Sequence, residues 1–154
     1  MFAHVLAVLQ QSPSITTIAV LGAKRPAGWD GLWLQDQSRG LNAELTAAHE
    51  TLDDSGLLVI HADLPLLSVD DVEALLGAAV SGCALAPDRH GTGTNALALS
   101  RFGPFDFSFG DGSLDRHIKT AKGKAAIVRR TGLAFDIDTP DDLDAALAKG
   151  FSFG

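Results

Sequence analysis

The 154-residue sequence predicts an α/β fold in which a mostly parallel sheet is flanked by helices. Short aliphatic runs alternate along the chain with segments whose apolar residues recur at helical spacing, and this alternation is typical of parallel sheets covered on both faces. Residues 56–61 are a continuous apolar run, as expected for a strand buried on both sides. The polar motifs fall at strand ends, where ligands bind in this class of fold. Because the sequence shows no linker and no domain-sized repeat, we expect residues 1–154 to form one domain.

The N-terminal half is expected to hold two helices and three strands. An apolar stripe at helical spacing runs through residues 2–11, and the proline of Ser12-Pro13-Ser14 ends that helix. Gly22 closes the β-rich run that follows, and a loop containing glycine and proline separates this run from a short second strand. In chain order the expected elements are a helix at 2–11, strands at 15–21 and 32–35, a helix at 40–49 and a strand at 56–61.

The C-terminal half is expected to continue the alternation. Ser68 precedes two acidic residues and an apolar stripe, which is the pattern of a capped helix start. Pro140, with acidic residues in the same turn, indicates another helix start. In chain order the expected elements are a helix at 68–80, strands at 83–86 and 96–99, a loop leading into a helix at 111–120, a strand at 125–129 and a helix at 141–147.

Composition narrows the functional classes. No apolar run approaches the ~20 residues that span a bilayer, and the N-terminus lacks a basic leader, so we expect a cytoplasmic protein without a membrane partner. The net charge of −7 disfavours non-specific nucleic-acid binding, which depends on contacts between cations and phosphates. The single cysteine, Cys83, excludes an internal disulfide and a zinc site made of cysteines.

The turn Gly91-Thr92-Gly93-Thr94-Asn95 lies between two apolar runs and is the most informative stretch of the chain. Glycines let the backbone approach a ligand closely, and successive N–H groups with threonine hydroxyls can surround an anion. Arg89, just before the turn, can bind a phosphate or carboxylate with two hydrogen bonds. A tight β-hairpin with polar filler explains the same residues without a ligand. The neighbouring Arg89, His90 and Asn95 favour the oxyanion site.

Carboxylates at two strand ends predict a magnesium site. Asp63 follows the apolar 56–61 run, which Pro65 prevents from continuing as a strand. Asp136 and Asp138 share one face of an extended segment, because side chains alternate along a strand. Two carboxylates, substrate phosphates and water are a usual shell for Mg²⁺. A helix cap or a turn is the alternative explanation for Asp63.

The motif FGDGSLDRH predicts a further anion site. Gly110 and Gly112 free the backbone ahead of a helix, and the N–H groups at a helix N-terminus attract phosphate. Arg116 and His117 lie about one turn into that helix. The Ser113 hydroxyl can donate to an anion, and capping of the helix is the alternative role for it.

Four motifs in this order, HADLPLLS, PDRHGTGTNALAL, FGDGSLDRH and DIDTPDDL, closely resemble those of the 2-phospho-L-lactate guanylyltransferases of deazaflavin-coenzyme biosynthesis. The resemblance covers residues 40–147 and implies a Rossmann-like fold of the nucleotide-diphospho-sugar transferase type. It implies that GMP passes from GTP to a phosphorylated three-carbon acid while pyrophosphate is released. The acid is 2-phospho-L-lactate, phosphoenolpyruvate or 3-phosphoglycerate, and the sequence does not choose among them.

The resemblance also implies roles for individual residues. Mg²⁺ is the implied cofactor, GTP and the phospho-acid are the implied partners, and the segment Gly40-Leu41-Asn42 matches one that lies near the nucleotide. The assignment, in full, is catalytic roles for Asp63, Asp138 and Arg89, substrate binding by Thr94, Asn95, Gly110, Ser113, Arg116 and His117, nucleotide binding by Gly40 and Asn42, and metal binding by Asp63, Asp136 and Asp138.

One element of the implied fold is missing from the sequence. The family opens with a strand and a basic triphosphate-binding loop before its first helix, whereas residues 1–154 begin at that helix. The strands expected at 15–21 and 56–61 would then have unpaired edges, which favour association. Direct pairing of these two strands, insertion of another segment, or a homodimer that shares an edge would each close the gap, and a homodimer or a longer chain is the favoured explanation. A shortened, non-catalytic homologue that binds a phospho-acid or a partner subunit is the alternative to an active enzyme.

Overall fold

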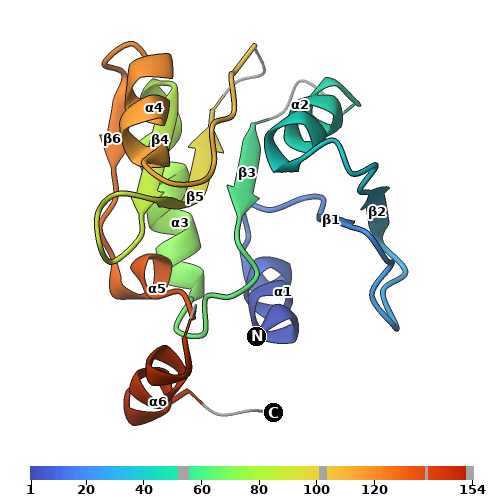
Figure 1. Ribbon diagram of the computed structural model, residues 1–154, viewed down its shortest axis with the longest axis vertical. Coiled ribbons are helices and arrows are strands. Elements are labelled where there is room, and N and C mark those ends of the chain that lie inside the picture. The colour runs from blue at the N-terminus through green and yellow to red at the C-terminus, as the bar shows by residue number, and fades with distance from the viewer. Residues whose placement is uncertain (52–55, 101–103, 138, 152–154) are drawn as a thin grey trace.

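The computed structural model describes residues 1–51, 56–100, 104–137 and 139–151, in which helices and strands alternate (Figure 1). The helices are α1 (Phe2–Gln11), α2 (Leu41–Thr51), α3 (Val69–Ala78), the 3-10 helix η1 (Ala79–Ser81), α4 (Ser113–Thr120), α5 (Thr131–Ala134) and α6 (Pro140–Ala148). The strands are β1 (Ala19–Gly22), β2 (Leu32–Gln35), β3 (Leu57–Ile60), β4 (Cys83–Pro87), β5 (Thr94–Leu99) and β6 (Ala125–Ile127). The expected order of elements is confirmed, and α5 is a short addition that the sequence pattern did not indicate. None of the described helices is both long and apolar enough to cross a bilayer.

A four-stranded mixed sheet with the strand order β3-β5-β4-β6 forms the centre of the fold. β4 and β6 are parallel, whereas β5 is antiparallel to both β3 and β4. The direction of β5 follows from its connection to β4, because only residues 88–93 lie between them and so short a link joins antiparallel strands. The α/β class is therefore confirmed, with β3, β4 and β6 running in one direction and β5 in the other.

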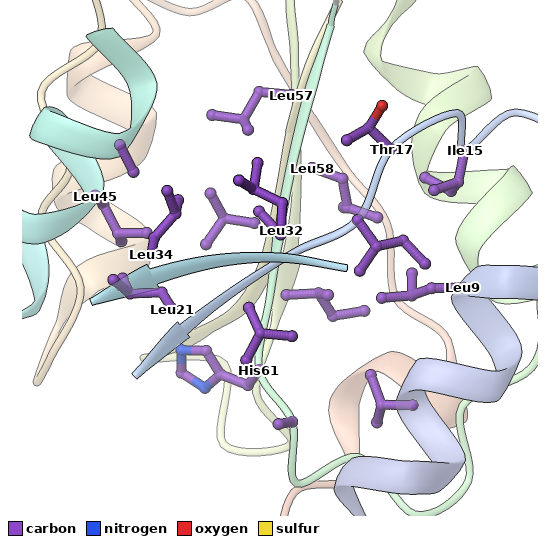
Figure 2. A pocket seen from close by; sticks show the side chains of 18 of the residues that line it. Leu9, Ile15, Thr17, Leu21, Leu32, Leu34, Leu45, Leu57, Leu58 and His61 are labelled. Atoms are coloured by element: carbon purple, nitrogen blue, oxygen red, sulfur yellow. The ribbon is translucent and has the colours of Figure 1, made fainter. Parts of the chain in front are cut away.

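β1 and β2 form a separate two-stranded parallel sheet, in which Ala19 pairs with Leu32. In the described chain β1 pairs with β2 and β3 with β5, so the two flanking strands of the expected gap do not pair with each other. A cavity of about 1490 Å³ separates them, lined by side chains from α1, α2, β1 and β3 (Figure 2). Leu21 of β1 and Leu57 of β3 are among its apolar walls. The place where the sequence predicts a missing strand is thus an open, mostly apolar cavity.

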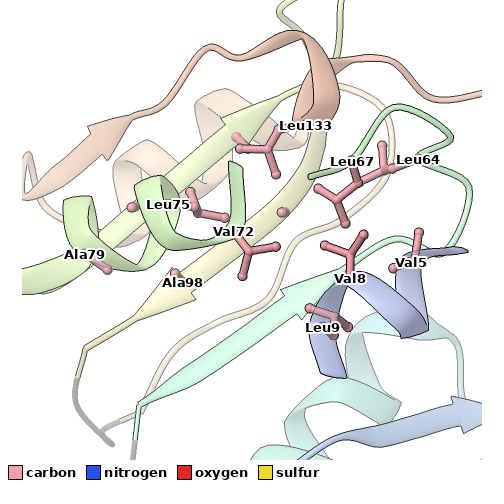
Figure 3. Close-up of a cluster of buried hydrophobic side chains, with 13 residues drawn as sticks. Val5, Val8, Leu9, Leu64, Leu67, Val72, Leu75, Ala79, Ala98 and Leu133 are labelled. Carbon is pink, nitrogen blue, oxygen red and sulfur yellow. The ribbon is translucent and has the colours of Figure 1, made fainter. Parts of the chain in front are cut away.

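Helices cover both faces of the four-stranded sheet, as its continuous apolar strands require. On one face α1, α3 and α5 pack over the alternating alanines of β4 and β5, with Val72 and Leu133 fully buried between them (Figure 3). On the other face α2, α4 and the segment 105–109 pack over Leu85 and Leu97. Because every residue of β4 and β5 is buried, the turn that joins these two strands is held firmly in place.

Two helices begin with reciprocal capping boxes. Ser68 Oγ accepts the Asp71 N–H at 3.3 Å, while Asp71 Oδ2 accepts the Ser68 N–H at 3.0 Å. Thr139 and Asp142 make the same exchange at the start of α6. The helix starts predicted from these residues are therefore confirmed.

Candidate active site

Asp88 organises the turn between β4 and β5. Its Oδ1 accepts the Thr92 N–H at 2.9 Å, and its carbonyl oxygen accepts the Gly91 N–H at 3.1 Å. A Cβ at position 93 would lie 2.7 Å from Asp88 Oδ2, so any residue larger than glycine there would displace the Asp88 carboxylate. The hairpin interpretation of this turn is confirmed, while the anion site stays a prediction. Asp88 is not among the residues predicted from the sequence, although an aspartate at the start of a turn is a recognised signal.

Thr94, Ser113 and His117 form a buried hydrogen-bonded cluster where β5 meets α4. Their exposed fractions are 3%, 1% and 0% respectively. Thr94 Oγ1 lies 3.1 Å from His117 Nδ1, and the Ser113 hydroxyl donates to Thr94 Oγ1 at 3.2 Å. The Ser108 N–H donates to the other ring nitrogen of His117 at 3.0 Å. The structure thus brings together three of the residues for which the sequence predicts substrate binding.

The Ser113 hydroxyl does not cap α4. The N-cap residue is Gly112, with φ 66°, and no side chain makes a capping hydrogen bond there. The first two N–H groups of the helix already have acceptors, since Ser113 N–H donates to Gly110 O at 3.0 Å and Leu114 N–H to Thr92 O at 3.1 Å. The capping explanation for Ser113 is therefore wrong, and an anion at this helix start would depend on hydroxyl donors rather than on these two N–H groups.

Arg116 braces the loop that precedes α4. Its guanidinium donates to the carbonyl oxygens of Asp111 at 2.6 Å and Ser108 at 2.9 Å. Gly110 and Gly112 lie in this loop with φ of 113° and 66°, a region that favours glycine. Arg116 therefore maintains the shape of the predicted anion-binding loop, and its own contact with substrate stays a prediction.

Asn42 joins α2 to the same loop. Its Oδ1 accepts the Phe109 N–H at 2.7 Å, and its Nδ2 donates to the Phe109 carbonyl at 3.1 Å. The Phe109 ring packs against His117 and against His61, with ring centroids 4.8 Å and 5.5 Å apart. His61 in turn lines the large cavity (Figure 2). The Gly40–Asn42 segment, predicted to lie near the nucleotide, thus adjoins both the cavity and the predicted phospho-acid loop.

Glu44, which is not among the residues predicted from the sequence, positions the backbone just before Gly40. Its carboxylate accepts the N–H groups of Gln37 at 2.8 Å and Arg39 at 3.1 Å and pairs with the Arg39 guanidinium at 2.7 Å. The hydrogen bond from the Arg39 side chain is the main reason why the pKa of Glu44 is lowered to about 2. The available signal was an arginine five residues before an acid in the first turn of a helix.

Arg89 and Asn95 fasten the hairpin to the C-terminal elements. An Arg89 guanidinium nitrogen lies 2.5 Å from Asp142 Oδ1, and the guanidinium lies 5.5 Å from the centroid of the Phe135 ring. Asn95 Nδ2 donates to the Leu133 carbonyl at 3.1 Å. Both side chains thus have structural contacts, and the predicted catalytic role of Arg89 and substrate contact of Asn95 stay predictions.

Asp63 is the strongest candidate metal ligand. Its Oδ1 is buried and has no hydrogen-bond partner among the described residues. A buried carboxylate oxygen without a donor is costly, and a hard cation is a partner that would satisfy it. Asp136 is half-buried, and Asp138 lies outside the described residues. Within the described ranges no group of three or more His, Cys, Asp or Glu side chains could hold a metal, and the magnesium site stays a prediction.

The hydroxyl cluster carries no net charge. Burial, aided by the positive charge of Arg116, lowers the pKa of His117 from 6.5 to about 4, so the ring is neutral near pH 7. Fixed neutral donors hold an oxyanion in place rather than react with it. The cluster of Thr94, Ser113 and His117 therefore offers neutral hydrogen-bond donors rather than a charged group.

Residues 30–152 match the protein family described as guanylyl transferase CofC-like. Phosphoenolpyruvate guanylyltransferases from Rubrobacter xylanophilus and Conexibacter woesei are 41% identical to this chain over 140 residues and 36% identical over 161 residues. These alignments cover 86% and 94% of this chain and 67% and 72% of the relatives. Against the relative from Sphaerobacter thermophilus the identity is 47% over 92 residues, which are 57% of this chain and only 44% of that relative.

A solved structure, described as a nucleotide-diphospho-sugar transferase from Desulfovibrio desulfuricans G20, superposes with a TM-score of 0.69 at 15% sequence identity. The superposition covers 94% of this chain and 70% of that chain. It confirms the expected fold class, and at this identity it shows the fold alone. Since the family match extends over most of the sequence, the chain belongs to the CofC-like guanylyl transferase family.

Proposed function

We propose that this chain binds a phosphorylated three-carbon acid and takes part in the transfer of GMP to it from GTP. The Thr94–Ser113 hydroxyl pair carries the proposal, because it adjoins a glycine-opened loop in a chain whose relatives are phosphoenolpyruvate guanylyltransferases. Phosphoenolpyruvate is the first acceptor to test. 2-Phospho-L-lactate and 3-phosphoglycerate have the same phosphate and carboxylate groups, and a role in deazaflavin-coenzyme biosynthesis belongs to the same proposal.

The proposed reaction balances without a covalent enzyme intermediate. A phosphate oxygen of the acceptor attacks the α-phosphorus of GTP, and a new P–O bond forms. The bond from the α-phosphorus to the oxygen that bridges to the β-phosphorus breaks, and pyrophosphate leaves with that electron pair. Thr94 and Ser113 would hold the phospho-acid, while Asn42 and Arg116 keep the neighbouring loop in shape. Transfer of this kind requires mainly positioning and charge neutralisation from the protein.

Mg²⁺ is the proposed cofactor, and the residues fit it at Asp63. The buried, unpartnered Oδ1 of Asp63 would be one ligand, with Asp136 and Asp138 as the candidates for a second. The ion would neutralise negative charge on the phosphates when bound.

The test is pyrophosphate release from GTP in the presence of phosphoenolpyruvate and MgCl₂. We expect release that requires both substrates, and strongly reduced release from the double variant Thr94→Val/Ser113→Ala. The exposed substitution Lys119→Gln, on the same helix, is the matched control and should leave the rate unchanged. Absence of release from the wild-type chain would contradict the transferase part of the proposal.

Binding of a phospho-acid without nucleotide transfer is the second candidate function. It is favoured by the open cavity beside His61 and by the contacts of Arg25, which donates to the carbonyl oxygens of Trp29 and Gly31. In the described residues this guanidinium is thus engaged within its own loop. Phosphoenolpyruvate binding without pyrophosphate release would support this function.

A further inference from the structure

Both ring nitrogens of His117 have partners, and one partner determines the tautomer. A backbone N–H can only donate, so Nε2, at 3.0 Å from the Ser108 nitrogen, accepts and carries no hydrogen. The ring is neutral because burial lowers the pKa of His117 to about 4. A neutral ring has a single N–H, which is therefore on Nδ1 and donates to Thr94 Oγ1 at 3.1 Å.

This donation determines how the two hydroxyl groups can be oriented. Thr94 Oγ1 accepts from His117, and the 3.2 Å contact between Thr94 and Ser113 uses one hydroxyl hydrogen. The pair has two such hydrogens, and in the part of the chain that the structure describes the second one has no acceptor. The hydroxyl group that carries this second hydrogen is therefore an available donor, and its oxygen is fixed in position beside the Gly110–Gly112 loop.

Both nitrogens of the His117 ring are already hydrogen-bonded within the protein, so the ring has no free polar atom for a substrate. It is fully buried, and the rings of Phe105 and Phe109 pack against it with centroids 5.9 Å and 4.8 Å away. The sequence suggests direct substrate binding by this histidine, whereas its two hydrogen bonds leave it only an action through Thr94.

We propose that His117 is a positioning residue, which orients the Thr94 and Ser113 hydroxyl groups so that one hydroxyl hydrogen is directed to the bound phospho-acid. This inference rests on the proposed function, because it takes the phospho-acid as the ligand of these hydroxyls.

The tautomer can be tested on the ligand-free wild-type protein. In a long-range ¹H–¹⁵N spectrum of ¹⁵N-histidine-labelled protein, we expect His117 as the Nδ1–H form with no titration between pH 5.5 and 8. An Nε2–H form, or protonation within this range, would overturn the inference whether or not the protein binds a phospho-acid.

The effect on binding can be tested with three variants and calorimetric titration of phosphoenolpyruvate. His117→Asn keeps an N–H donor near the position of Nδ1, whereas His117→Phe keeps the ring shape and removes both hydrogen bonds. Phe105→Leu alters the packing around the ring without touching its hydrogen bonds and is the structural control. We expect His117→Phe to weaken binding about tenfold, and His117→Asn and Phe105→Leu to remain within about threefold of the wild type.

The outcomes separate this inference from the proposed function. Binding by the wild type with an unchanged affinity in His117→Phe would overturn the positioning role alone. Equal losses in His117→Phe and Phe105→Leu at equal melting temperatures would show a packing role and would also overturn it. If the wild type did not bind phosphoenolpyruvate at all, the proposed function would fail and this inference with it.

Discussion

The side-chain amide of Asn42 makes two hydrogen bonds to the backbone of Phe109, accepting from its N–H at 2.7 Å and donating to its carbonyl at 3.1 Å. A neighbouring strand would satisfy the same two backbone groups, so one side chain takes the place of a strand here. The two residues are 67 positions apart, and the bond joins α2 to the loop before α4. The position of the predicted phospho-acid loop therefore depends on this contact.

Replacing Asn42 with alanine should destabilise the protein and weaken phosphoenolpyruvate binding. Two hydrogen bonds to a partly buried backbone are lost, which corresponds to ~1–3 kcal/mol in the free energy of unfolding. Urea denaturation followed by circular dichroism measures this change. Glu50→Gln, on the exposed side of the same helix, is the control and should unfold like the wild type. An Asn42→Ala variant as stable as the wild type would contradict the role of this contact.

Replacing Glu44 with glutamine should lower the melting temperature at pH 7 and have less effect in acid. The fold holds the pKa of Glu44 at about 2, below its ordinary 4.5, mainly through the Arg39 side chain. The ionised form thus stabilises the fold above pH 4.5, and this contribution is lost as the pH falls through about 2. In thermal melts at pH 7, 4 and 2.5, the difference in melting temperature between the wild type and Glu44→Gln should become smaller as the pH falls. A difference in melting temperature that stays constant over this pH range would contradict the stabilising role of the ionised Glu44 carboxylate.

Replacing Asp63 with asparagine should remove Mg²⁺-dependent GTP binding with little change in melting temperature. The reason is that Asp63 Oδ1 has no hydrogen-bond partner among the described residues to lose, while a cation would lose a charged ligand. Calorimetric titration of GTP with and without MgCl₂ measures the dependence. Asp70→Asn, on an exposed position of α3, is the control. Unchanged Mg²⁺ dependence in Asp63→Asn would exclude Asp63 as a ligand.

The open edges of β1 and β3 should favour self-association. Both strands are apolar and only partly buried, and each pairs on one side in the described chain. We expect light scattering after size-exclusion chromatography to give twice the chain mass of 16.1 kDa. Val20→Lys, at the cavity wall, should shift the protein towards the monomer, whereas Val80→Lys, on a residue 79% exposed, should not. A wild-type protein that stays monomeric at all concentrations would contradict the homodimer.

The features that could be predicted from the sequence are local ones. The starts of α3 and α6 could be predicted because the residues that mark them are neighbours in the sequence: Ser68 precedes two acidic residues, and Pro140 has acidic residues in the same turn. The grouping of Thr94 with Ser113 followed from the resemblance of the GTGTN and FGDGS motifs to those of the guanylyltransferases. Glycine spacing also located the loop at Gly110, whose positive φ the structure shows.

The remaining contacts could not be predicted because their partners are distant or have several local uses. Nothing near Asn42 in the sequence indicates that its amide binds Phe109. Asp88 and Glu44 look like ordinary turn and helix-start residues until the fold supplies the N–H groups that they accept. The direction of β5 was left open for the same reason, since the turn residues suit a hairpin as well as an anion site.

Binding of a phospho-acid by the Thr94–Ser113 hydroxyl pair can be measured by calorimetric titration of phosphoenolpyruvate into the wild type and Thr94→Val. Loss of a hydrogen bond to a charged ligand corresponds to ~1–3 kcal/mol, and each 1.4 kcal/mol is about tenfold in affinity. The account predicts measurable binding by the wild type, at least fivefold weaker binding by Thr94→Val (about 1 kcal/mol), and a similar loss in Ser113→Ala. Wild-type affinity in both variants would contradict it.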